Sequence, residues 1–414
     1  MTTSNTPIYA SQARPWLKFY DQKYIDQTMP ACTAFELVCR QNKNRLGETA
    51  LEYYGRKFTY ADFIVNVKKT AAALRAAGLK KGDIATVVSV MTPEIIFAFY
   101  AADMIGATLN LVDPRYSVEG IREYIEEVDS HLLICLNVTY ERCHKAEKRT
   151  NVERVLVISP ADSLPLHLAV GYKLTNPDKN RYKSNVIHWK DFIAGGQGQS
   201  TAADPVDPMD HACVVVHTGG TTGSPKGVML THRNVISNIQ GVLKNLQPSG
   251  HETFLSFLPL SHTFERTTSY YLALGLGYTT AFNRSIANLQ ADFREIRPTV
   301  LMSVPRVYEM IYAKLQDGLA KKSKFVRYLF DWAVEVGWRR FCRENGLPVE
   351  SSSRAWLDPF VAGFLDKKVG SQLRAVFGDR IHLYISGGAA LSPAVARTFF
   401  ALGVPIYQGY GMTE

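Results

Sequence analysis

The sequence predicts an α/β fold in which mostly parallel strands are covered by helices on both faces. Apolar, β-rich runs recur along the chain, at 84–90, 131–136, 154–159, 212–217, 253–260, 299–304, 381–386 and 404–409. Helix-like segments lie between several of them, for example at 93–106 and 305–320. Continuous apolar strands that alternate with helices are typical of parallel sheets buried on both faces. Many of these runs end in Gly, Ser, Thr or Pro, where open α/β sheets carry their ligand-binding loops.

The composition is that of an ordinary soluble protein with room for more than one domain. The chain has 414 residues, of which 46% are hydrophobic and 21% charged, so it can form two or three domain-sized cores. Its formal net charge of +9 favours anionic partners such as nucleotides or acidic membrane surfaces. The positive residues are scattered and form no polybasic tail, so nucleic-acid binding is not expected.

Cysteine usage and the N-terminal sequence favour a cytoplasmic protein. The six cysteines are spread thinly and include no C-x-x-C pair, so reduced thiols are expected, and neither a zinc site nor disulfides. The first residues, MTTSNTPIYASQARPW, lack the basic and apolar regions of a signal peptide. The most apolar helical stretch, 95–112, is interrupted by Asp103 and Asn110 and is too short to span a bilayer.

Composition along the chain predicts two α/β lobes. The segment 194–210 is rich in Gly, Ser and Pro and indicates a linker or exposed loop, which places the first lobe at 1–205 and the second at 206–414. Residues 320–368, rich in aromatic and basic side chains, are expected to form a helical insertion. Its part 320–343 is interpreted as a helix whose aromatic face packs on the second lobe, with a membrane-surface helix as the alternative.

The loop TGGTTGSPKG (218–227) has the composition of a phosphate-binding loop. Its glycines allow the backbone N–H groups to turn inward, its hydroxyl side chains add donors, and Lys226 supplies a positive charge. A flexible surface loop is the simpler alternative, but so many glycine and hydroxyl residues directly after a buried strand are unusual for a connecting loop. The loop is not a Walker A motif, because Pro225 precedes the lysine and Gly227 follows it.

Together with three later motifs, this loop resembles the signature of the adenylate-forming enzymes, which include acyl-CoA synthetases, luciferases and adenylation domains. LPLSHTFER (258–266) is similar to the segment that carries the family's histidine near the acyl site. ISGGAALS (385–392) resembles the adenine-binding turn, and YQGYGMTE (407–414) resembles the second nucleotide motif. The motifs occur in the family's order. The sequences of 258–266 and 305–315, followed by the aromatic insertion, are most similar to those of long-chain fatty acyl-CoA synthetases.

The resemblance implies a role for each matching residue. Lys226 and His262 are the catalytic candidates, and Thr218 and Glu414 are the expected magnesium ligands, since Mg²⁺ prefers oxygen donors. His262, Thr263 and Arg266 are assigned to the acyl and coenzyme A site, although a bacterial-type relative has a gating tryptophan where this chain has Arg266. The residues expected to bind the nucleotide are Thr218, Gly219, Gly220, Thr221, Thr222, Gly223, Lys226, Gly387, Gly388, Ala389, Gln408, Gly409, Tyr410, Gly411 and Thr413.

The reaction implied by the resemblance uses ATP, Mg²⁺ and coenzyme A to activate a carboxylic acid, expected to be a long-chain fatty acid. The carboxylate attacks the α-phosphorus of ATP, pyrophosphate leaves, and a thiol then displaces AMP from the acyl-adenylate. Because the triphosphate is highly charged, positioning and electrostatics dominate such catalysis.

Two other functions stay open at this point. One is transfer of the acyl group to a carrier-protein thiol, and the other is a non-catalytic module that binds a nucleotide or an acyl group. The chain ends at Glu414, whereas the family continues into a ribose-binding aspartate, a hinge and a small C-terminal domain with a catalytic lysine. The expectation is therefore a truncated large domain, weakly active or inactive alone.

Overall fold

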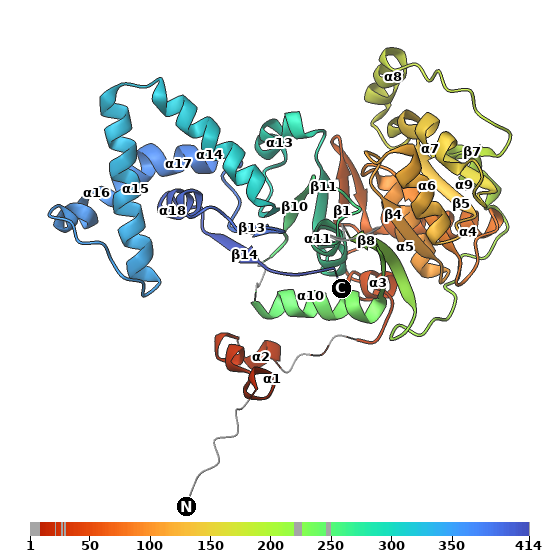
Figure 1. Ribbon diagram of the computed structural model, residues 1–414, viewed down its shortest axis with the longest axis horizontal. Helices are drawn as coiled ribbons and strands as arrows, with labels where there is room; N and C mark the ends of the chain where they lie inside the picture. The colour runs from red at the N-terminus through yellow and green to blue at the C-terminus, as the bar shows by residue number, and fades with distance from the viewer. Residues whose placement is uncertain are drawn as a thin grey trace, which may run out of the picture.

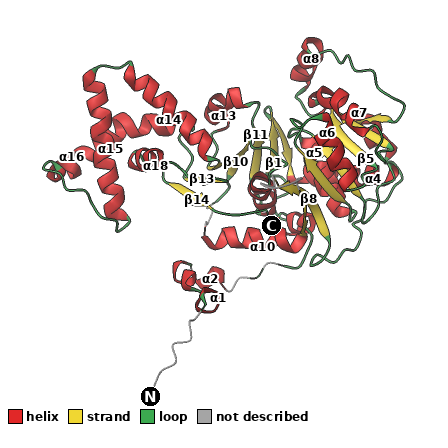
Figure 2. Cartoon of the chain, in the orientation of Figure 1, coloured by secondary structure: helices red, strands yellow, loops and turns green. Residues whose placement is uncertain are grey.

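The computed structural model describes residues 9–20, 22–25, 28, 30–218, 226–245 and 250–413. It contains two seven-stranded sheets, and Figures 1 and 2 show them with helices packed around both. The expected α/β class, with two mostly parallel sheets covered by helices, is confirmed.

The first sheet has the strand order β7-β6-β5-β3-β4-β8-β9. Its neighbours are parallel except for β8 and β9, which form an antiparallel pair at one edge. The strands are β3 (Ile84–Val88), β4 (Thr108–Val112), β5 (Leu132–Leu136), β6 (Arg154–Ile158), β7 (Val186–His188), β8 (Ala212–Thr218) and β9 (Lys226–Thr231).

The second sheet has the order β14-β13-β12-β10-β11-β1-β2. Only the edge pair of β1 and β2 is antiparallel. The strands are β1 (Thr49–Tyr53), β2 (Arg56–Thr59), β10 (Thr253–Ser256), β11 (Thr279–Phe282), β12 (Val300–Ser303), β13 (Leu383–Gly387) and β14 (Ile406–Gly409). The two sheets therefore interleave along the sequence, and the lobe boundary at 205/206 stays a prediction.

Helices connect and cover the strands. Around the first sheet and the junction of the sheets lie α3 (Ala34–Gln41), α4 (Tyr60–Ala76), α5 (Pro93–Met104), α6 (Val118–Glu127), α7 (Tyr140–Glu147), α8 (Leu166–Thr175), α9 (Trp189–Gly195) and α10 (His232–Asn245). Between β10 and β11 run α11 (Thr263–Glu265), a π-helical segment (Arg266–Leu272) and α12 (Ala273–Gly275). Short helices α1 (Ala10–Ala13) and α2 (Gln22–Ile25) precede the core.

The helices α13 to α18 form a separate group beside the second sheet, on the left of Figure 1. They are α13 (Leu289–Ile296), α14 (Pro305–Ala320), α15 (Lys324–Glu344), α16 (Asp358–Leu365), α17 (Ser371–Val376) and α18 (Pro393–Ala401), with the π-helical segment Asp366–Gly370 between α16 and α17. The expected helical insertion is thus confirmed. The inner face of α15 buries Phe330, Ala333 and Val336, so the helix packs on its neighbours. The expected solvation of its charges is wrong for Arg339, which is buried, and Phe325 is exposed instead of packed.

One sequence expectation is wrong. The apolar stretch 95–112 does not form one helical segment, because α5 ends at Met104 and β4 begins at Thr108. Gly106, with φ at +69°, turns the chain between them in a conformation that glycine adopts without steric cost. Within the described ranges, no helix combines the length and apolar character needed to cross a bilayer.

The hydrophobic core joins the two sheets. Its largest cluster includes Leu51 of β1, Val214 of β8 and Phe254 of β10, all almost fully buried. A second cluster fills the space between the second sheet and α13 to α18, and a third lies between the first sheet and α6 and α7. The shared core fixes the edges of the two sheets relative to each other, which positions the loops at their strand ends.

Candidate functional site

A cleft of about 340 Å³ lies where strand ends of the two sheets meet. Five segments line it: the end of β4 and the loop after it, Tyr124 of α6, the end of β8, the loop after β10, and Thr413. In Figure 1 the chain after β14 runs to this central region, beside α11. The cleft lies at the carboxyl ends of parallel strands, the usual ligand-binding edge of an α/β sheet.

Four residues predicted from the sequence meet in this cleft. Thr218, His262, Thr263 and Thr413 all line it, although they come from distant parts of the chain. The hydroxyl oxygens of Thr263 and Thr413 lie 3.4 Å apart. Hydroxyl groups that converge on one cleft are suited to contact phosphate or carboxylate oxygens.

His262 is the N-cap residue of α11, and its Nδ1 accepts a hydrogen bond from the backbone N–H of Phe264 at 3.2 Å. Loss of hydration and then the positive charge of Arg266 lower the pKa of His262. A neutral imidazole that accepts at Nδ1 carries its proton on Nε2. The ring can therefore donate a hydrogen bond to an anionic oxygen bound in the cleft.

Arg266 does not line the cleft, although the sequence assigned it to the acyl and coenzyme A site. Its side chain is 1% exposed, and none of its guanidinium nitrogens has a hydrogen-bond partner in the part of the chain that the structure describes. Its backbone N–H donates to the carbonyl of His262 at 3.4 Å. Burial lowers the pKa of Arg266. The residue lies one helical turn after His262 and behind the surface of the cleft.

The glycine-rich loop joins two antiparallel strands. Thr218 ends β8, Lys226 begins β9, and these two residues are cross-strand partners. The predicted phosphate ligands Gly219, Gly220, Thr221, Thr222 and Gly223 lie outside the described residues, as does the predicted metal ligand Glu414. A Walker A loop connects a strand to a helix, so the strand-to-strand connection agrees with its exclusion from sequence.

The adenine motifs lie side by side at the end of the second sheet. Gly387 of β13 pairs with Gly409 of β14. Gly388 follows with φ at +82°, a turn conformation that favours glycine, and the Leu391 N–H donates to Oε1 of Gln408 at 3.0 Å. The exposed residues of this edge that were predicted to bind the nucleotide are Gly388, Ala389, Gln408, Gly409, Tyr410 and Gly411. Among the described residues of the two motifs, only Thr413 reaches the 340 Å³ cleft.

An acidic and a basic residue beside the cleft were not predicted from the sequence. Asp113 and Arg115 follow β4 and form an ion pair, with Nη2 and Oδ2 2.5 Å apart. Burial opposes ionisation of Asp113, but hydrogen bonds from Arg115 outweigh it and lower the carboxyl pKa. Polar residues directly after an apolar strand were a usable signal here, but β4 was hidden in the stretch interpreted as helical.

Glu127, the last residue of α6, was also missed. Its Oε2 lies 2.8 Å from Nε2 of His217 in β8, and its Oε1 accepts the N–H of Gly227 in β9 at 2.9 Å. The ring of His217 is buried, and loss of hydration lowers its pKa although Glu127 opposes this shift. Glu127 thus holds together the two strands on either side of the glycine-rich loop. No local pattern around a glutamate on a helix predicts such a contact.

Relatives with known functions match most of the chain. Fatty acyl-CoA synthetase A of Dictyostelium discoideum is 27% identical over 360 residues, which cover 86% of this chain and 50% of that protein. Long chain acyl-CoA synthetase 3 of Arabidopsis thaliana is 28% identical over 369 residues, covering 86% of this chain and 51% of that protein. The chain therefore spans about half the length of the curated relatives it matches.

Solved structures show the same fold. The adenylation domain of a carboxylate reductase from Mycobacterium chelonae has a TM-score of 0.69 at 21% identity, covering 99% of this chain and 64% of that one. A long-chain-fatty-acid-CoA ligase from Archaeoglobus fulgidus has a TM-score of 0.66 at 17% identity, and the match covers 94% of this chain and 65% of that one. The family model described as AMP-binding enzyme matches residues 38–414. The chain belongs to this family of AMP-binding enzymes.

Proposed function

We propose that this chain carries the site at which ATP activates a carboxylic acid in an AMP-forming acyl-CoA ligase. The observation that supports this most is the convergence of Thr218, His262, Thr263 and Thr413 in one cleft. They come from three separate motifs, because Thr218 belongs to the glycine-rich loop, His262 and Thr263 to 258–266, and Thr413 to 407–414. The name of the Dictyostelium relative favours a fatty acid as the substrate, and that of the Arabidopsis relative favours a long acyl chain.

In the proposed first step, a carboxylate oxygen of the acid attacks the α-phosphorus of ATP, and the bond to the β-phosphate bridging oxygen breaks. Pyrophosphate leaves and a mixed anhydride, the acyl-adenylate, remains. Lys226, exposed at the start of β9, offsets the charge of the departing phosphates. The Nε2–H of His262 holds the carboxylate or an α-phosphate oxygen in line for attack.

In the proposed second step, the thiol of coenzyme A adds to the acyl carbonyl carbon and AMP leaves. Thr263, next to His262 on the cleft wall, is assigned to the thiol's approach. Mg²⁺ would neutralise phosphate charge when bound. The hydroxyl of Thr218 at the mouth of the loop fits a hard oxygen ligand for this ion, with Glu414 as its proposed partner.

The test is ATP–pyrophosphate exchange measured with this chain and a panel of carboxylic acids. Slow exchange that long-chain fatty acids stimulate more than acetate or aromatic acids is the expected result. Lys226→Ala should lower the exchange rate on the order of 100-fold, the usual cost of removing a charge-stabilising donor, while Lys57→Ala on β2 should not change it. Nucleotide binding with no exchange under any acid would contradict catalysis by this chain and favour a binding module.

A further inference from the structure

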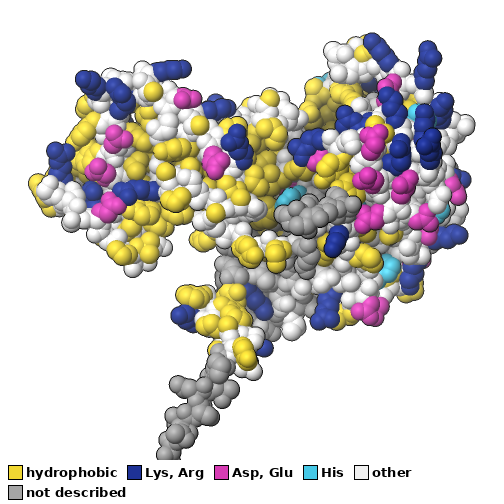
Figure 3. All heavy atoms as spheres, viewed as in Figure 1, with side chains coloured by type: hydrophobic (Ala, Val, Ile, Leu, Met, Phe, Trp, Pro, Cys, Tyr) yellow, Lys and Arg dark blue, Asp and Glu magenta, His cyan; other side chains and the backbone are white. Residues whose placement is uncertain are grey.

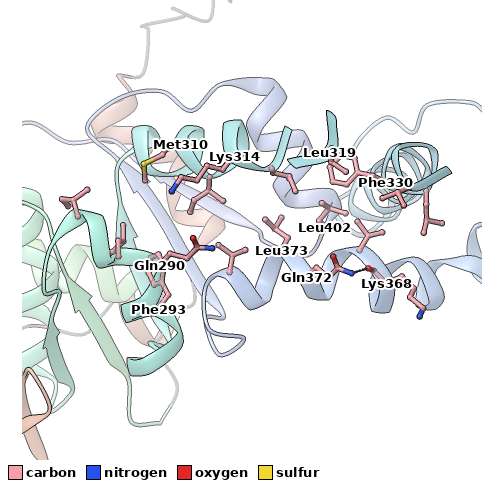
Figure 4. A pocket seen from close by; sticks show the side chains of 18 of the residues that line it. Gln290, Phe293, Met310, Lys314, Leu319, Phe330, Lys368, Gln372, Leu373 and Leu402 are labelled. Atoms are coloured by element: carbon pink, nitrogen blue, oxygen red, sulfur yellow. Dashed lines mark hydrogen bonds between the residues drawn. The ribbon is translucent and has the colours of Figure 1, made fainter. Parts of the chain in front are cut away.

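A second and larger cavity lies among the helices α13, α14, α15 and α17. Its volume is about 860 Å³, within the range of roughly 300 to 1,000 Å³ that holds small organic ligands. Figure 4 shows Leu373 and Leu402 in its middle, with Gln290, Met310 and Lys314 towards one end and Phe330 and Lys368 towards the other. The cavity is thus elongated, with an apolar interior between two ends that each carry polar side chains.

This cavity is distinct from the cleft described above. The two share no lining residue. The cleft is lined largely by strand ends and the loops that follow them, whereas the larger cavity is lined mainly by helices that cover the second sheet. A molecule bound among these helices would therefore leave the cleft open to a nucleotide.

The interior of the cavity is suited to a hydrocarbon chain. Phe293, Leu373 and Leu402 are buried members of the core between the second sheet and the helices. Leu315 and Leu319 of α14 are half-buried and face them. Apolar walls of this kind offer water few polar partners and favour apolar molecules.

The polar groups of the cavity are few and suit a single carboxylate. Lys314 of α14 and Gln290 of α13 lie towards the same end in Figure 4. An ammonium and a side-chain amide can both donate to carboxylate oxygens. At the other end, the Gln372 amide donates to the carbonyl of Lys368 at 2.8 Å, so this amide is already engaged. Lining of this kind offers too few donors for a nucleotide.

We propose that this cavity is a second acyl site, which binds a long-chain fatty acid. Its carboxylate meets Lys314 and Gln290, and its alkyl chain lies along Leu319, Leu373 and Leu402. The proposal rests on the cavity itself and does not require the proposed activity of the cleft. Its consequence is that this chain binds a fatty acid in the absence of ATP, at a site separate from the nucleotide.

The experiment is a fluorescence titration of the chain with cis-parinaric acid, a fluorescent fatty acid. Leu315→Trp fills the cavity from α14 and should weaken probe binding at least about 10-fold, as loss of the buried alkyl contacts requires. Gln316→Trp, the next residue on the same helix and outside the cavity lining, is the matched control and should bind like the parent. Lys314→Met should weaken binding about 10-fold, as expected for loss of a charged hydrogen bond, and Lys368→Met should have little effect.

Two results would overturn the inference. One is failure of the parent chain to bind the probe. The other is binding that Leu315→Trp and Lys314→Met leave unchanged. If His262→Ala abolishes binding instead, the fatty acid occupies the cleft alone, and the proposed function survives while the second site does not. Lys314→Met keeps the test decisive if circular dichroism shows that Leu315→Trp does not fold.

Discussion

Glu265 places a fully buried carboxyl group three residues from the histidine of the cleft. Its Oε1 accepts a hydrogen bond from the hydroxyl of Ser256 at 2.5 Å. Burial raises the pKa of Glu265 from about 4.5 to about 7, although the Ser256 hydrogen bond opposes the shift. Near neutral pH this group is therefore partly protonated, unlike an exposed glutamate.

This raised pKa predicts a pH-dependent stability. A carboxyl whose pKa is higher in the folded state binds more protons there, so its contribution is fully present below pH 4.5 and is lost as the pH rises towards 7. The parent chain should lose on the order of 3 kcal/mol in free energy of unfolding over this pH interval, and Glu265→Gln should abolish that loss. Urea unfolding at both pH values measures it, and parallel profiles for the variant and its parent would show that Glu265 does not titrate in this way.

Glu127 is the clearest positioning residue in the site. Glu127→Ala removes both its contact to His217 and its contact to the N–H of Gly227, so the strands flanking the glycine-rich loop lose their shared anchor. We expect ATP binding to weaken by about 10-fold, in line with the loss of a hydrogen bond to a charged group. Isothermal titration with ATP measures this change.

Glu127→Gln is the matched control, because its amide retains one acceptor and a similar shape. It should recover most of the ATP affinity that Glu127→Ala loses. Equal losses in both variants, or a fall in melting temperature with unchanged affinity, would assign Glu127 a purely structural role.

At the scale of elements, α15 and α18 cross in close contact. A Cβ on Gly337 of α15 would lie 1.9 Å from the carbonyl oxygen of Ala401. Beside this point the rings of Phe341 and Phe400 stack with centroids 4.8 Å apart. On its other side α15 is tied to α16, because Arg339 donates to both oxygens of the buried Asp358. The insertion is therefore an integrated part of the second lobe.

This crossing predicts opposite effects for two glycine-to-alanine changes. Gly337→Ala must separate the two helices and should lower the free energy of unfolding by about 1–3 kcal/mol. Gly171→Ala in α8, where nothing lies within 4 Å of the new Cβ, should raise it by about 0.5–1 kcal/mol. Chemical denaturation of both variants tests this. A neutral Gly337→Ala would mean that the helices do not approach so closely.

The strands recovered from the sequence are those with continuous apolar runs, such as β5 and β12, because burial on both faces leaves a strong local pattern. Several of the missed strands lack this pattern or are masked by a neighbouring element. β1 contains Glu52 and β9 is largely unburied along its length, and β4 follows directly on an equally apolar helix. The positions of edge strands and of helix–strand junctions depend on tertiary pairing, which cannot be predicted from local composition.

At the scale of the whole molecule, the motifs could be recognised from sequence but their meeting point could not. Nothing local indicates that β1 joins the sheet of β10 to β14, or that β8 and β9 close the edge of the other sheet. These pairings bring Thr218 near His262 and Thr413. The same long-range contacts place Glu127 and Asp113 at the site, and for this reason the sequence alone did not reveal them.

The central claim is that this arrangement activates a carboxylate by adenylation. The most direct measurement incubates the chain with a long-chain fatty acid and ATP labelled at its α-phosphate, followed by separation of the products. Adenylation should yield a labelled acyl-adenylate together with unlabelled pyrophosphate, and His262→Ala should lose both. Label recovered in ADP would show attack at the γ-phosphate, and would contradict it.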